Sequence, residues 1–159
     1  MIIKAPNLIN DSGKIKIFLS GAIDIGMADY WQTEVSKFLD DKFKDKIVVY
    51  DPRRPDWDSS WKQDINDKNF SEQVNWELEH IDSCDIAVVY FTKDSKAPIT
   101  LLELGHLAAN PHKLIVFCPD GFYRKGNIDI FCQKYGILNL SDLNGFYNTL
   151  YNIVQSNPL

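Results

Sequence analysis

Glu103 is the residue of this sequence best suited to act as a carboxylate nucleophile. Residues 98–103 are predicted to enter a helix from the loop after a buried strand, which puts Glu103 in the first helical turn. The helix dipole favours an ionised carboxylate there. Leucines flank it on nearly every side, so the charge must be either well partnered or functional. The alternative is a capping box, in which Thr100 and Glu103 satisfy each other's backbone donors.

Glu77 is the second candidate for chemistry. It interrupts an apolar stripe formed at helical spacing by Phe70, Val74 and Ile81. A carboxyl group on such a face would have a raised pKa and could hold or deliver a proton. Alternatively, Glu77 lies at the edge of the stripe and pairs with an arginine or lysine.

Each of four further residues could either bind a ligand or have a purely structural role. Trp57, on the polar loop 53–69, could stack on a heterocycle or fold back as a loop core. Arg54 could bind an anionic group or pair with a nearby aspartate. Asp24 could face the site or be an ordinary turn residue. Trp31 could touch a base, although its spacing favours packing.

These residues are expected to be positioned by strands that alternate with helices. The predicted strands are residues 15–20, 47–50, 86–91, 114–118 and 137–140. The predicted helices are residues 29–43, 70–81, 100–109, 128–134 and 141–154, the last capped by Ser141 or Asp142. Residues 1–13 are expected to be a loose lead-in.

This alternation predicts an α/β fold with right-handed crossovers. We expect a flavodoxin-like, doubly wound sheet of five parallel strands in the order 2-1-3-4-5, with helices on both faces. The chain of 159 residues fits one domain spanning residues 1–159. In such folds ligands bind beyond the carboxyl ends of the strands.

Composition and charge exclude several classes of function. The net charge of −5, with no Lys/Arg cluster to offset it, argues against a nucleic acid polymer as partner. No apolar run approaches the length of a bilayer span, and no secretion signal is evident. Three widely spaced cysteines indicate a reducing compartment, and we expect a cytoplasmic protein.

Metal and cofactor sites are not expected. The three histidines form no ligand pattern. The sequence contains no Gly-x-Gly-x-x-Gly, Walker A or Gly-x-Ser-x-Gly motif, which argues against dinucleotide dehydrogenases, P-loop enzymes and serine hydrolases.

Several short motifs, taken together and in order, resemble the nucleoside 2-deoxyribosyltransferase family, in particular its deoxyribosyltransferase-like branch. They are FLSGAI at 18–23, WQ at 31–32, DPRRPDWD at 51–58, QVNWE at 73–77, PITLLELG at 98–105 and YRKGN at 123–127. Better-known members also carry an Asp near the loop after the third strand, where this chain has DSKA at 94–97. The base preference is therefore left open.

The resemblance implies a role for each matching position. Glu103 would be the nucleophile, and Glu77 would contact the base and assist its proton transfers. Asn127 would reach a neighbouring subunit of a homo-oligomer, a dimer or hexamer, and bind the 5'-hydroxyl. Gly21 and Ala22 would line the pocket for sugar and base. Asp24, Trp31, Arg54 and Trp57 would be further substrate-binding residues.

The implied reaction moves 2-deoxyribose between nucleobases with retention, through a covalent deoxyribosyl-glutamate. Its partners would be 2'-deoxynucleosides and free nucleobases, without a cofactor. One alternative is an N-glycoside hydrolase of deoxynucleosides or their 5'-monophosphates. Another is a non-catalytic nucleotide-binding or sensing domain, because a fold does not by itself establish a function.

Overall fold

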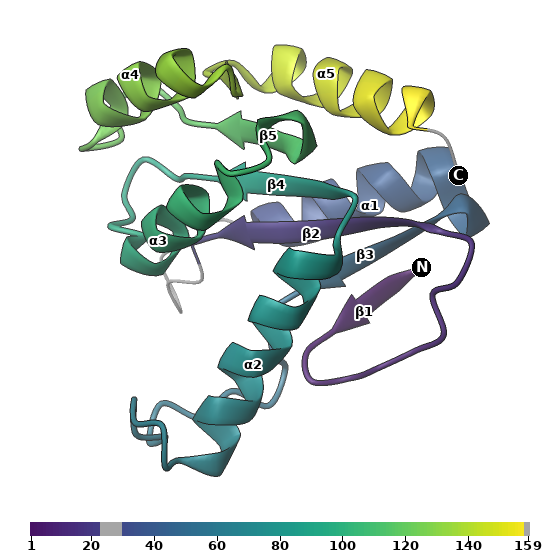
Figure 1. Ribbon diagram of the computed structural model, residues 1–159, viewed down its shortest axis with the longest axis vertical. Helices are drawn as coiled ribbons and strands as arrows, with labels where there is room; N and C mark the ends of the chain where they lie inside the picture. The colour runs from purple at the N-terminus through teal and green to yellow at the C-terminus, as the bar shows by residue number, and fades with distance from the viewer. Residues whose placement is uncertain (23–29, 158–159) are drawn as a thin grey trace.

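The computed structural model describes residues 1–22 and 30–157. Six strands in these residues form one sheet in the order β1-β3-β2-β4-β5-β6, and every neighbouring pair is parallel. The strands are β1 (Ile2–Lys4), β2 (Ile15–Gly21), β3 (Ile47–Asp51), β4 (Ile86–Tyr90), β5 (Leu114–Phe117) and β6 (Leu138–Leu140). An α/β fold with a parallel sheet, as predicted, is therefore confirmed (Figure 1).

The prediction of a five-stranded sheet is wrong, because the sheet of the described residues has six strands; the five predicted strands, β2 to β6, keep the order 2-1-3-4-5 among themselves. The segment taken for a loose lead-in contributes β1, which pairs with β3 at the edge of the sheet. With only three residues, of which Ile3 alone is buried, β1 is too short to show a period of two in the sequence. It forms because the edge of β3 offers unpaired backbone groups.

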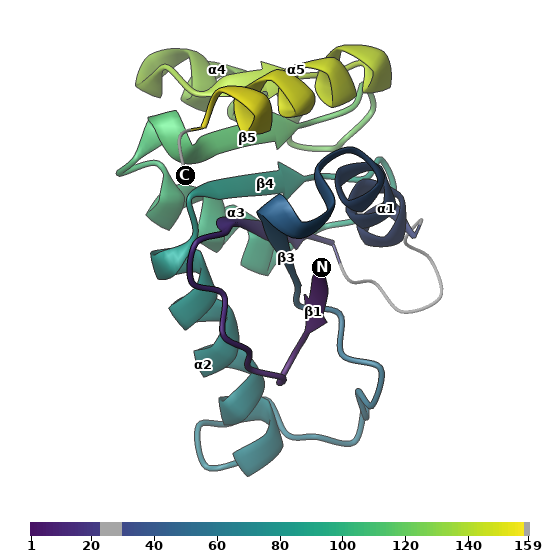
Figure 2. The ribbon, with the colours of Figure 1, turned by 90° about the vertical axis from the view of Figure 1, so that its right-hand side faces the viewer.

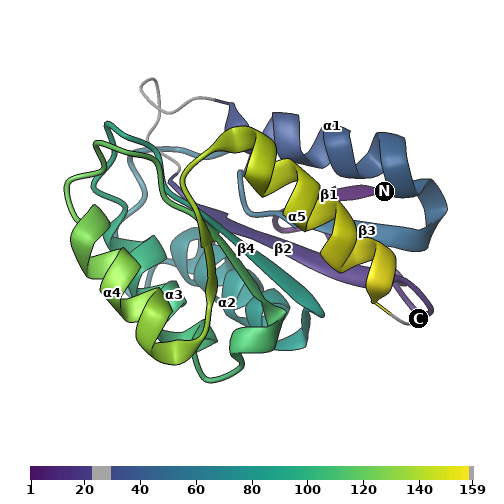
Figure 3. The same cartoon turned by 90° about the horizontal axis from the view of Figure 1, so that it is seen from above.

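In residues 1–22 and 30–157, five α-helices cover the sheet. They are α1 (Trp31–Phe43), α2 (Lys68–Ser83), α3 (Pro98–Leu107), α4 (Lys125–Tyr135) and α5 (Leu143–Ser156). Figure 3 shows α1 and α5 on one face of the sheet and α2, α3 and α4 on the other. Within the described ranges, no helix is long and apolar enough to span a membrane.

Each face of the sheet has its own apolar core, because alternate strand residues point to opposite sides. Ile17 and Leu19 of β2 belong to the core beneath α1 and α5, whereas Phe18 belongs to the core beneath α2, α3 and α4. Ser20 lies two residues after Phe18, so the two side chains point to the same face of the sheet. Its side chain therefore faces α2 and α3.

Caps account for where two of the helices begin. Asp67 accepts hydrogen bonds from the backbone N–H groups of Asn69 and Phe70 at the start of α2. Asp142 accepts from Gly145 at the start of α5, so of the two expected caps Asp142 is the one used. Figure 2 shows the loop between β3 and α2 extending beyond the sheet beside the beginning of α2. This loop forms one wall of the candidate site.

Candidate active site

A cavity of about 850 Å³ lies at the carboxyl ends of β2 and β3, between α2 and α3. Its wall is built from Gly21 and Ala22 at the end of β2, the loop after β3, one face of α2, and one face of α3 from Pro98 to His106. Ligand sites in proteins commonly measure about 300–1,000 Å³, and parallel sheets hold them at this edge. The cavity is therefore large enough for a small molecule and lies where the fold favours binding.

Glu103 lines this cavity from α3. The helix begins at Pro98 with Ala97 as its N-cap, so Glu103 is its sixth residue and lies in the second turn, not the first as predicted. The N-cap makes no side-chain hydrogen bond, so the alternative of a Thr100–Glu103 capping box is wrong. Instead, Oε2 of Glu103 accepts a 2.6 Å hydrogen bond from the hydroxyl of Ser20.

Two opposing effects act on the charge of Glu103. Burial raises the pKa of its carboxyl group, and the hydrogen bond from Ser20 lowers that pKa. The donor is a neutral hydroxyl, and in the described part of the chain no cation forms an ion pair with Glu103. A carboxylate held in this way keeps its other oxygen available for reaction.

Glu77 lines the same cavity from α2. Its Oε1 accepts a 2.8 Å hydrogen bond from Nε2 of Gln73, one turn earlier on the helix. The pKa of Glu77 is raised to about 7, mainly because burial disfavours the carboxylate; the hydrogen bond from Gln73 lowers this pKa, and the negative charge of Glu103 raises it. Near neutral pH this group can hold a proton or give it up, as a general acid or base must.

The alternative in which Glu77 forms an ion pair with an arginine is not found among the described residues. Arg54 binds Asp56 at 2.9 Å and Glu72 at 3.0 Å. The guanidinium of Arg53 lies over the ring of Tyr30, 4.8 Å from its centroid.

Gly21 and Ala22 line the cavity, and Trp31 packs behind them. Trp31 is buried, stacks on Tyr90 with ring centroids 4.5 Å apart, and donates a hydrogen bond of 3.1 Å to the carbonyl of Ala22. It is not part of the cavity wall. Its place in the structure thus matches the packing interpretation of its spacing.

Arg54 and Trp57 line the cavity from the loop after β3. The ring of Trp57 contacts that of Trp61 edge to face, with centroids 5.1 Å apart, and Arg54 lies over the same Trp61 ring at 4.9 Å. The loop therefore has a small core of its own while presenting Trp57, which is 37% exposed, to the cavity.

Two predicted substrate-binding residues are not placed in the cavity. Asn127 is exposed on α4 and does not line the cavity of its own chain. Asp24 lies outside the described residues.

The comparison with known families agrees with this geometry. Residues 14–122, well over half of the chain, match the family model described as nucleoside 2-deoxyribosyltransferase like. The chain belongs to this family. No curated protein matched the sequence. The matched region of this nucleoside 2-deoxyribosyltransferase-like chain contains Glu77 and Glu103, whereas Asn127 lies beyond it.

Sequence reasoning did not identify the two groups that hold the carboxylates. Both residues appear in it only as members of the family motifs, Ser20 in FLSGAI at 18–23 and Gln73 in QVNWE at 73–77. Gln73 precedes Glu77 by four residues, so the helical spacing contained the signal for that contact. Ser20 and Glu103 are 83 residues apart, and no local pattern joins them.

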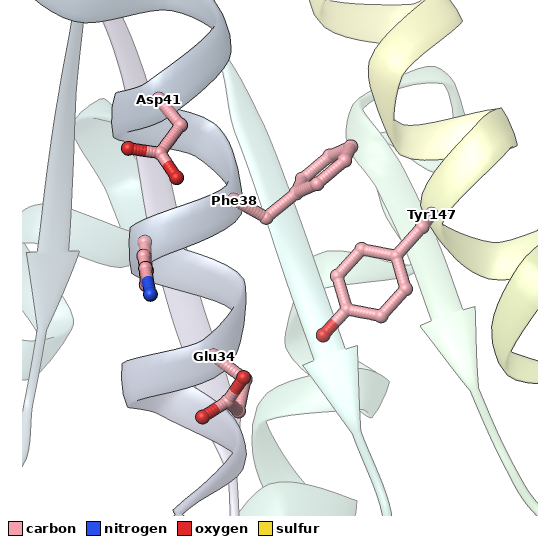
Figure 4. Close-up of a pocket in the computed structure, with 5 residues that line it drawn as sticks. Glu34, Phe38, Asp41 and Tyr147 are labelled. Atoms are coloured by element: carbon pink, nitrogen blue, oxygen red, sulfur yellow. The ribbon is translucent and has the colours of Figure 1, made fainter.

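The described residues contain no cluster of three or more potential metal ligands. A second hollow, of about 300 Å³, lies on the other face of the sheet and is open to solvent. Figure 4 shows Glu34, Phe38 and Asp41 along α1, with Tyr147 of α5 opposite them. Of these two hollows, the one between α2 and α3 is the more enclosed, and it contains the carboxyl groups of Glu77 and Glu103.

Proposed function

We propose that this protein is an enzyme that transfers 2-deoxyribose between nucleobases with retention, through a covalent deoxyribosyl-glutamate at Glu103. The observation that carries the proposal is the pair of carboxyl groups in one cavity, each held by a neutral donor. The negative charge of Glu103 contributes to the raised pKa of Glu77. The pair therefore favours a state in which Glu103 is ionised and Glu77 is protonated.

The first half of the reaction breaks the glycosidic bond. Glu103 attacks C1' of the deoxynucleoside, the C1'–N bond breaks, and its electron pair leaves with the base. Glu77 donates its proton to that base and becomes a carboxylate. The transition state resembles an oxocarbenium ion, which the negative charge of Glu103 stabilises.

The second half regenerates the enzyme. A nitrogen of the incoming base attacks C1', the bond from C1' to Glu103 breaks, and Glu77 takes the proton that this nitrogen loses. Two displacements at C1' retain its configuration. A 2'-hydroxyl would withdraw electrons from the cationic transition state, which accounts for a preference for deoxyribose.

We further propose that the enzyme works as a homo-oligomer in the cytoplasm. Ile99 and Leu102 line the mouth of the cavity yet are 60% and 71% exposed, as expected for a surface that a neighbouring subunit covers. Asn127 would then bind the 5'-hydroxyl in the neighbouring subunit's site. The three cysteines are free and buried, which supports a reducing compartment.

The test is chromatography of the full chain with deoxyinosine and adenine. We expect deoxyadenosine and hypoxanthine, and we expect Glu103→Ala to abolish turnover while its circular dichroism is unchanged. Glu79→Ala, on the exposed side of α2, is the matched control and should retain full activity. Release of free deoxyribose without transfer would identify a hydrolase instead.

The covalent intermediate has its own test. A 2'-deoxy-2'-fluoroarabinosyl donor slows both displacements, because fluorine destabilises the oxocarbenium-like transition state. Mass spectrometry should then find the sugar attached to the peptide that contains Glu103. A folded Glu103→Ala variant that retains turnover would contradict the assignment.

A further inference from the structure

The buried side chain of Gln73 makes two hydrogen bonds with one nitrogen. Its Nε2 donates to the carbonyl oxygen of Pro52 at 2.8 Å and to Oε1 of Glu77 at 2.8 Å, and the residue is only 4% exposed. The carbonyl of Pro52 can only accept, so the nitrogen and not the oxygen of the amide must face it. The loop after β3 therefore fixes the orientation of the Gln73 amide.

This orientation decides which oxygen of Glu77 can carry a proton. Oε1 faces an N–H donor, and a proton placed there would oppose the donor's own hydrogen. Oε2 accepts no hydrogen bond from any described residue. A protonated Glu77 therefore carries its hydrogen on Oε2.

We propose that Gln73 is a positioning residue that fixes the acid proton of Glu77 on Oε2, an inference that rests on the proposed function of Glu77 as the acid. Glu77 then delivers its proton from a defined atom, and Gln73 positions that proton without a charge of its own. A lysine or arginine in its place would hold Glu77 as a carboxylate and remove the acid.

Other charged and titratable side chains line the cavity around Glu77. They are Lys4 from β1, Arg53 and Arg54 from the loop after β3, and Glu103 and His106 from α3. In the described part of the chain none of them forms an ion pair with Glu77. Glu103 acts on it through its negative charge, and Gln73 is its hydrogen-bond partner.

The first test follows the carboxyl group itself, without substrate. Glutamate labelled with ¹³C at Cδ is titrated by NMR in the full chain, and Glu77→Gln assigns the resonance. Gln73→Met keeps the length of the side chain and removes the donor. We expect the pKa of Glu77 to rise by about one unit, as for the loss of one hydrogen bond to a carboxylate.

Two more variants keep this test decisive. Gln73→Glu places a second carboxyl group at the same distance and should also raise the pKa of Glu77. Asn75→Ala removes another amide contact on α2, that with Ser71, and should leave the titration unchanged. An unchanged or lowered pKa of Glu77 in either folded Gln73 variant would overturn the proposal.

The second test uses the pH dependence of kcat/KM. The rate falls on the alkaline side as Glu77 loses its proton, so in Gln73→Met this limb should move to higher pH while kcat drops. Simple destabilisation would not move the limb upward. If the Gln73 variants shift the NMR titration of Glu77 but the wild-type protein shows no transfer activity, the proposed function alone is refuted. If transfer is normal and the titration is unshifted, only the role of Gln73 is refuted.

Discussion

The hydroxyl of Ser20, at the end of β2, donates a hydrogen bond of 2.6 Å to Oε2 of Glu103 on α3. The contact joins a strand end to a helix and fixes the carboxylate in the cavity wall. It occupies one oxygen and leaves the other free for the attack on a sugar carbon that we propose. Glu77 is held in the same manner by Gln73, so both carboxyl groups are oriented by neutral donors.

Ser20→Ala should lower kcat/KM about 10- to 100-fold, the equivalent of one hydrogen bond to a charged group. Loss of the donor raises the pKa of Glu103, which must be ionised to attack. The acid limb of the pH profile should therefore move to higher pH. Ser36→Ala, a buried serine on α1, is the control. An acid limb that stays in place would refute the role of Ser20.

Glu77→Gln should make the protein more stable at alkaline pH. The unfolded chain loses the Glu77 proton near its ordinary pKa of 4.5, whereas the folded chain keeps it up to about pH 7. The free energy of unfolding of the wild-type protein therefore falls as the pH rises from 4.5 to 7, because the folded chain must keep a proton that the unfolded chain has lost. The variant should gain at most about 3 kcal/mol at pH 8 and little at pH 4.5.

Urea unfolding at the two pH values measures this gain. Glu79→Gln, on the exposed side of the same helix, should show no such pH-dependent difference from wild type. An equal effect of Glu77→Gln at both pH values would mean that burial does not raise the pKa of Glu77.

Gly21→Ala should destabilise the protein by about 1–3 kcal/mol through overpacking. An added Cβ would lie 2.4 Å from Cζ2 of Trp31 and 2.5 Å from the carbonyl oxygen of Tyr90, and pairing of β2 with β4 limits movement of the backbone. Gly105→Ala is the control on α3: its Cβ meets nothing within 4 Å, and alanine favours the helix by up to about 1 kcal/mol. Thermal unfolding should therefore shift in opposite directions for the two variants.

Asn127→Ala should weaken deoxynucleoside binding and raise KM without unfolding the protein, because the residue is exposed on α4. If Asn127 acts in the neighbouring subunit's site, mixing this variant with Glu103→Ala should form hybrid sites that combine an intact Glu103 with an intact Asn127. Activity above the sum of the two separate proteins is the expected result. Strict additivity in mixed oligomers would place Asn127 outside the site.

Much of the fold could be read from the sequence because its longer elements have clear periods. The buried strands β4 and β5 and the amphipathic helices α1 and α2 lie close to the predicted ranges. The strand β1 was missed because only its pairing with β3 makes it a strand. The start of α3 was misplaced because Pro98 at its first position, after the left-handed Ala97, replaces the expected Thr100 cap.

The sequence indicated the two carboxyl groups of the candidate site but not the residues that hold them. Glu103 and Glu77 could be proposed from their apolar surroundings, and both line one cavity. Their partners follow from tertiary contacts, since Ser20 reaches α3 across the sheet and Gln73 is oriented by the carbonyl of Pro52. A sequence pattern contains neither the reach of a hydroxyl nor the orientation of an amide.

Trp57 gives the cavity an optical signal of its own. Its indole borders the cavity and is partly exposed, whereas Trp61 packs against it without lining the cavity, and Trp31 and Trp76 are buried in the two apolar cores. A heterocycle that stacks on Trp57 changes the polarity around that indole and quenches its emission. Intrinsic fluorescence can thus follow the binding of a nucleobase alone, in the absence of any turnover, with Trp57→Phe as the silent reference.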